Sequence, residues 1–184
     1  MVDEHYYALA RSCGQAIAKA GYRMVYGGGG VGLMGASAMA AFENGGQVLG
    51  IIPEFLTKVE ALLDTVEHRI VKDMHERKQM MYQESDAYIV LPGGIGTMEE
   101  AIEVMSWMRL KLHTKPMVFV DTDNYWAPLI KLFNATIDAK FTPEWVRAHL
   151  FHCHSAKDAL AQIKDQWQNP APKGHIKVSK LDMV

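Results

Sequence analysis

Apolar and polar positions follow two different spacing patterns along the chain. Apolar residues recurring every three or four positions predict helices, and short apolar runs that end in glycine or proline predict buried strands. Helices are predicted at 4–20, 32–44, 74–85, 97–111, 125–139 and 156–167. Strands are predicted at 23–26, 47–52, 68–71, 87–91, 117–120 and 150–153, with 54–66 as a loop containing a helical turn.

This alternation predicts one α/β domain: a Rossmann-like, doubly wound parallel sheet covered by helices on both faces. We expect the domain to span residues 1–167 and a loosely held tail to span 168–184. Ligands of such sheets bind at the carboxyl ends of the strands. The chain opens in a helix where a strand is usual, so either a first strand is absent or the sheet is built without it.

Composition narrows the class of protein. The 184 residues are 49% apolar and 22% charged, as in ordinary globular domains, and the net charge of −2 gives no reason to expect nucleic-acid binding. No apolar run is long enough to span a membrane. The two cysteines, Cys13 and Cys153, form no metal or disulfide motif, so we expect a cytoplasmic protein.

A first glycine-rich turn follows the strand at 23–26. Gly30, Gly32 and Gly35 fit the pattern G-x-G-x-x-G, and Glu54 lies at about the distance expected for a ribose-binding acid. Three interpretations stay open: dinucleotide binding, another phosphate or sugar contact, or tight packing of strand on helix.

The second turn, Pro92-Gly-Gly-Ile-Gly-Thr-Met-Glu-Glu100, follows an apolar strand and opens a helix. Glycine backbone and free helical N–H groups form a phosphate cradle. No Gly-Lys-Ser/Thr follows, so a Walker A loop is disfavoured. Glu99 and Glu100 are expected in the first helical turn, beside the anion. Thr97 and Glu100 also have capping-box spacing, which would make Glu100 structural.

A third element, Glu76-Arg77-Lys78, places two cations at a helix start. The arginine fork suits phosphate or carboxylate, although a solvated charged face would give the same pattern. Together, the Gly27–Gly35 turn with its Gly-Leu-Met-Gly, this triplet and Pro-Gly-Gly-x-Gly-Thr-x-x-Glu resemble the Lonely guy family over residues 5–165. Its members release cytokinin bases from riboside 5′-monophosphates, and relatives cleave AMP.

The resemblance implies roles for individual residues. Arg77 and Glu100 match the catalytic pair, and Ser106 aligns with a threonine at the family's site. Glu60, seven residues after Pro53, falls where the family has a substrate-contacting acid. The remaining implied substrate contacts are Lys78, Gly93, Gly94, Ile95, Gly96, Thr97, Met98 and Glu99.

The resemblance also implies a homodimer whose sites the partner subunit completes. The Met-rich helix at 98–111, with Met105, Trp107 and Met108, is a candidate interface; core packing is the alternative. Relatives open with a strand and a Cys-Gly-Ser turn that this sequence lacks. Many members carry the label lysine decarboxylase, but no residue here marks a pyridoxal-phosphate lysine, and no cofactor is expected.

Two functions remain in competition. The first is hydrolysis of a purine nucleoside 5′-monophosphate to free base and ribose 5-phosphate, with Glu100 stabilising positive charge on the ribose. The second is a nucleotide or cofactor carrier that binds without hydrolysis, which would not need both Arg77 and Glu100. His149, His152 and His154 look like a metal cluster, but two histidines on one strand face make a thin site, and no metal is expected. His113 and Asp121 have no identifiable partners.

Overall fold

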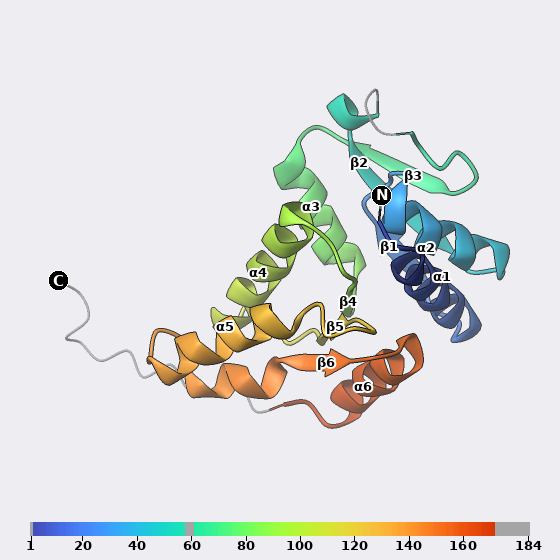
Figure 1. The fold of residues 1–184 in the computed structure, drawn as a ribbon. Coiled ribbons are helices and arrows are strands. Elements are labelled where there is room, and N and C mark those ends of the chain that lie inside the picture. The colour runs from blue at the N-terminus through green and yellow to red at the C-terminus, as the bar shows by residue number, and fades with distance from the viewer. Residues whose placement is uncertain (1, 58–60, 172–184) are drawn as a thin grey trace.

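Helices and parallel strands alternate along the chain (Figure 1). The computed structural model describes residues 2–57 and 61–171. The helices are α1 (Glu4–Lys19), α2 (Gly32–Glu43), α3 (Met74–Glu84), α4 (Ile95–Arg109), α5 (Ala127–Asp138) and α6 (Ala156–Gln168), with short 3-10 helices η1 (Glu54–Leu56) and η2 (Glu144–His149). The strands are β1 (Met24–Tyr26), β2 (Val48–Pro53), β3 (Glu67–Val71), β4 (Tyr88–Val90), β5 (Met117–Val120) and β6 (Phe151–Cys153).

The strands form two parallel three-stranded sheets, in the orders β1-β2-β3 and β4-β5-β6. Leu49 pairs with Glu67 in the first sheet, and Val118 pairs with Phe151 in the second. The α/β class with parallel strands is therefore confirmed. Within the described residues, no strand pairing joins β1 to β4, so the parallel strands lie in two sheets.

Two cavities lie at the gap between β1 and β4, one on each face of the molecule. A cavity of about 310 Å³ lies on the side of α3 and α4, and one of about 230 Å³ lies on the side of α1 and α6. Met24 and Val25 of β1 and Ile89 of β4 line both cavities. The two sheets thus lie on either side of a gap between β1 and β4.

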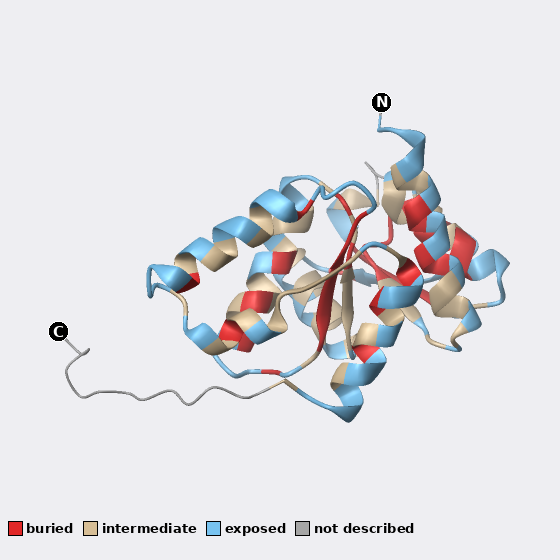
Figure 2. Ribbon diagram, turned by 60° about the horizontal axis from the view of Figure 1, so that its bottom comes forward, coloured by how far each residue is buried: buried red, intermediate tan, exposed pale blue. Residues whose placement is uncertain are grey.

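Helix packing joins the halves across this gap. Leu9 and Cys13 of α1 share a core cluster with Val118 of β5 and Ile163 of α6. The same helix packs closely on α2 of the other half, where Gly14 lies against the backbone of Ser37. Buried residues accordingly concentrate on the strands and on the inner faces of the helices (Figure 2).

Helix starts follow ordinary capping chemistry. The Asp73 carboxylate accepts the N–H of Glu76 at 2.9 Å and begins α3, and Ser155 does the same for α6. The predicted helical turn in 54–66 is confirmed as η1, whereas η2 was not predicted. Within the described residues, no helix has the length and apolarity to cross a membrane.

Candidate active site

The cavity of about 310 Å³ runs along β1 and β4 and reaches their carboxyl ends, where ligands of parallel sheets bind. Gly27, which follows β1, lines it together with Arg77 of α3 and with Thr97 and Glu100 of α4. Three segments that the sequence analysis singled out separately therefore meet at one place.

Arg77 crosses from one half of the molecule toward the other. Its Nε donates to the carbonyl of Ile51 at 3.2 Å, and its Nη1 lies 3.3 Å from Oε1 of Glu100. Only 12% of the Arg77 side chain is exposed. A Cβ at Gly27 would lie 2.1 Å from Nη2 of Arg77, so the glycine leaves the space that the guanidinium occupies.

Glu100 is half-buried against Arg77. Burial raises the pKa of its carboxyl above the ordinary value, and the positive charge of Arg77 partly opposes that rise. Such a group combines the reactivity of a carboxylate with a fixed cationic neighbour. A half-buried carboxylate with a shifted pKa and a cationic neighbour in a cavity is a candidate functional group.

The capping-box interpretation of Glu100 is wrong. Helix α4 begins at Ile95 with Gly94 as its N-cap, two residues earlier than predicted, and the N–H of Met98 already bonds the Gly94 carbonyl. Thr97 therefore lies inside the first turn, and Glu99 and Glu100 lie in the second. The Glu100 carboxylate does not cap the helix and lies instead beside the guanidinium of Arg77.

The second glycine turn has the form of an anion site. The N–H groups at the start of α4 have no partner inside the helix, and Ile95 and Gly96 are exposed there. A Cβ at Gly93 would lie 2.2 Å from Oγ1 of Thr97, so this glycine permits the close turn. A cavity of about 520 Å³ runs between this turn and the first glycine turn, where Val31 lines it.

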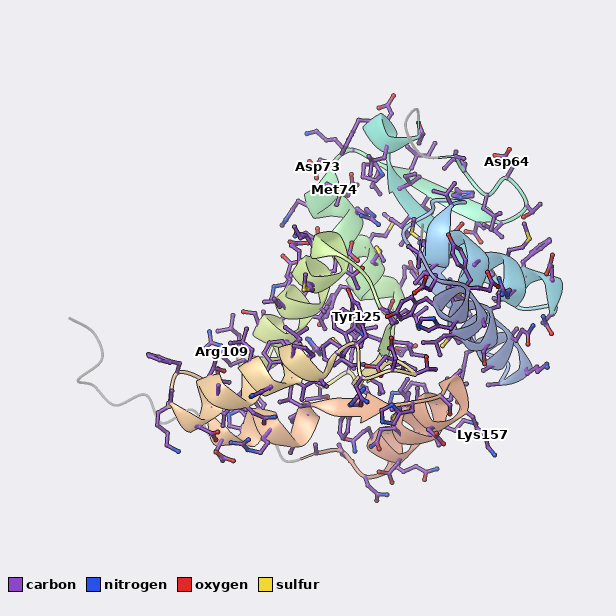
Figure 3. All side chains as sticks on the ribbon, in the orientation of Figure 1. Asp64, Asp73, Met74, Arg109, Tyr125 and Lys157 are labelled. Carbon is purple, nitrogen blue, oxygen red and sulfur yellow. The ribbon has the colours of Figure 1, made fainter. Side chains whose placement is uncertain are left out.

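Tyr125 is a site residue that sequence reasoning missed. Its hydroxyl donates to the carbonyl of Gly93 at 2.8 Å, and it lines the cavity of about 520 Å³. Figure 3 shows Tyr125 on the segment between β5 and α5, well away from Arg109 at the far end of α4. Its position just beyond the end of a parallel strand was the available signal.

Lys78 is held by two carboxylates of α4. Its Nζ lies 2.7 Å from Oε1 of Glu99 and 3.0 Å from Oε1 of Glu103. These bonds raise the pKa of the Lys78 ammonium, led by the one to Glu99. Lys78 and Glu99 thus lie beside the Arg77–Glu100 pair and fix α3 against α4.

Other predicted site residues have different surroundings. Met98 packs against the core cluster of the second half, and Ser106 does not line the cavities at the glycine turns. Met105 and Met108 are buried in the same core cluster, so core packing explains them better than an interface. Glu60 lies outside the described residues.

Tight packing accounts for part of the first glycine turn. A Cβ at Gly35 would lie 2.1 Å from the Gly30 carbonyl oxygen, and one at Gly30 would lie 2.8 Å from that of Ala61. Glu54, the residue at the distance of a ribose-binding acid, is exposed on η1. The packing interpretation therefore holds for Gly30 and Gly35, whereas Gly27 leaves space for the Arg77 guanidinium.

The fold and the site define an α/β protein with an arginine–carboxylate pair between two glycine turns. The profile of the family described as "Possible lysine decarboxylase" matches residues 34–163. The chain is 42% identical over 162 residues to a cytokinin riboside 5′-monophosphate phosphoribohydrolase of Rhodococcoides fascians, covering 86% of this chain and 81% of that protein. It is 36% identical over 161 residues to one of Arabidopsis thaliana, covering 87% and 74%. The chain belongs to this family, the Lonely guy family.

Solved structures share the fold at lower identity. The molybdenum cofactor carrier protein of Chlamydomonas reinhardtii matches with a TM-score of 0.69 at 21% identity, covering 91% of both chains. The molybdenum cofactor binding protein of Rippkaea orientalis matches with a TM-score of 0.67 at 20% identity, covering 90% of both chains. At this identity the likeness concerns the fold alone.

Proposed function

We propose that the protein hydrolyses the N-glycosidic bond of a purine nucleoside 5′-monophosphate, either a cytokinin riboside 5′-monophosphate or AMP, to free base and ribose 5-phosphate. The observation that carries this proposal is the Arg77–Glu100 pair, 3.3 Å apart in a cavity next to a helix N-terminus. The names of the relatives in Rhodococcoides fascians and Arabidopsis thaliana support the same reaction.

The proposal gives each part of the substrate a place. The 5′-phosphate binds the N–H groups of the turn from Gly93 to Thr97, at the positive end of the α4 dipole. The ribose then lies toward Glu100, and the purine occupies the apolar part of the cavity, lined by Met34 and Val104.

Bond cleavage develops positive charge on the ribose. The Glu100 carboxylate stabilises that charge or takes a proton from the attacking water, and Arg77 orients the substrate. Water adds its hydroxyl to the anomeric carbon, and the base leaves with the bonding electrons and gains a proton.

Chromatography of reaction mixtures tests the proposal. The wild type should convert AMP or a cytokinin riboside monophosphate to base and ribose 5-phosphate. Glu100→Gln should lower kcat by about 10²–10⁴-fold, the range for loss of a general acid–base group. Glu43→Gln, at an exposed position ending α2, is the matched control and should keep wild-type turnover.

Binding without any product would refute the hydrolase and favour the carrier. Wild-type turnover in Glu100→Gln would remove this carboxylate from the mechanism. Folding of each variant is checked by circular dichroism, so that a lost fold is not mistaken for lost chemistry.

We also propose that the protein is a cytoplasmic homodimer. Its interface would use the outer face of α4 and the residues after it, where Ile102, Leu110 and Leu112 are exposed by 46%, 48% and 64%. Exposed apolar groups in one region are typical of an interaction surface. A monomer in sedimentation velocity at micromolar concentration would contradict the dimer.

A further inference from the structure

Asp121 lies among histidines at the carboxyl ends of β5 and β6. The strand register pairs Val120 with Cys153, so Asp121, one residue beyond β5, lies next to His152 and His154. Nε2 of His152 lies 2.9 Å from Oδ2 of Asp121, and Nδ1 of His154 lies 3.5 Å from Oδ1. No partner of Asp121 could be identified from the sequence. The parallel pairing of β5 with β6 brings two partners to it, His152 and His154.

We propose that Asp121, His152 and His154 form a binding site for a divalent metal ion, and that zinc is the ion they bind best. One ligand atom from each residue lies within 4.8 Å of the other two. Ligands about 2.1 Å from a tetrahedral zinc are about 3.4 Å apart, so small side-chain rotations suffice. Two imidazoles and one carboxylate suit zinc better than magnesium or calcium.

The carboxylate is held as a metal ligand needs to be. Asp121 is fully buried, and its oxygens accept the N–H groups of Asn124 and Trp126, both at 2.9 Å. These two bonds orient the carboxylate. A metal ion would take the place of the hydrogen bond between Nε2 of His152 and Oδ2 of Asp121.

The two histidine rings lie on the same side of the chain as the Asp121 carboxylate. The His152 and His154 rings lie 4.7 Å apart, centroid to centroid, because alternate residues of a strand face the same side. Cys153 between them faces the opposite side, against the cluster of α1 and α6. The His154 side chain is 61% exposed, so the ion could enter from solvent and keep a water ligand.

The site would stiffen a segment that reaches the glycine turn. Asp121 anchors the backbone of residues 124–126, and the Tyr125 hydroxyl bonds the Gly93 carbonyl. A metal ion here would therefore fix the wall of the neighbouring cavity. This proposal does not depend on the hydrolase function, because its site shares no residue with the Arg77–Glu100 pair.

Zinc uptake by untagged protein tests the proposal. After dialysis against zinc, elemental analysis should find one ion per chain in the wild type, and titration should give an affinity at least about tenfold lower in His152→Ala and in His154→Ala. His75→Ala removes an exposed histidine of α3 and should bind zinc as the wild type does. The His154→Ala variant removes only an exposed ring, so its fold should persist.

Cobalt gives a second readout. Cobalt(II) bound in place of zinc should produce visible absorption bands that are lost in both histidine variants. Wild-type zinc affinity in the two variants, or no uptake by the wild type, would overturn the proposal and leave the contacts of Asp121 as structural hydrogen bonds only.

Discussion

Arg77 owes its position to three parts of the chain. The carbonyl of Ile51 accepts from Nε, Glu100 attracts Nη1, and Gly27 leaves space at Nη2. A guanidinium held on all sides loses little freedom when substrate binds, which favours accurate placement.

Gly27→Ala tests this arrangement. The new Cβ would meet Nη2 of Arg77 at 2.1 Å and Sδ of Met34 at 2.9 Å, both at the ends of flexible side chains. We expect these side chains to move and the fold to survive, with a fall in kcat of about 10²-fold from the displaced guanidinium. Phosphoribohydrolase assays and thermal denaturation measure the two effects. Unchanged kcat would show that the position of Arg77 does not matter for the reaction.

At the scale of elements, helices tie the two halves together. Arg77 and Lys78 of α3 form ion pairs with carboxylates of α4. Tyr82 of α3 meets Trp107 of α4 edge-on, at 5.1 Å between ring centroids. On the other face, α1 contacts α2 so closely that a Cβ at Gly14 would lie 2.0 Å from the carbonyl oxygen of Ser37.

Gly14→Ala should destabilise the protein. Helix propensity alone predicts a gain of about 1 kcal/mol, but the obstructing atoms are backbone and cannot rotate away. We expect a loss of about 1–3 kcal/mol in the free energy of unfolding, as for other overpacked cores, measured by urea denaturation. Gln15→Ala, at the exposed neighbouring position, should change stability by less than about 0.5 kcal/mol. If Gly14→Ala were more stable than the wild type, the gain in helix propensity would outweigh the steric conflict with the backbone of α2.

The sequence located the helices and strands well, because the spacing of apolar residues within each element depends only on nearby residues. It placed the start of α4 two residues late, since the extended Gly94 and not Thr97 caps the helix. Arg77 and Glu100 were found through family resemblance and adjacent glycines. The partners of Asp121 and Tyr125 were not found, because strand register and loop contacts join residues 31 or more apart in sequence.

The whole molecule is organised around the break between β1 and β4. Strands β2 and β5 have a neighbour on both sides, whereas β1 and β4 are each paired on one side within the described residues. The N–H of Met24 bonds the Gln47 carbonyl and that of Tyr88 bonds the Pro116 carbonyl, so both point away from the gap. The alternating residues Val25 and Ile89 therefore point their N–H groups into it.

Residue-resolved hydrogen exchange should reveal this asymmetry. We expect the amides of Val25 and Ile89 to exchange at least about tenfold faster than those of Tyr26 and Val90, whose N–H groups face a paired strand. The adjacent residues of the same strands serve as the control. Equal protection would mean that the N–H groups facing the gap are bonded as firmly as the others.

Arg77 and Glu100 stand on opposite sides of this discontinuity, so no ladder of strand hydrogen bonds fixes the distance between them. A nucleotide with its phosphate on α4 and its sugar against Arg77 would therefore connect the two halves directly, in addition to the helix packing that joins them. Release of the products would remove that connection, so the protein should resist unfolding less after release than in the complex.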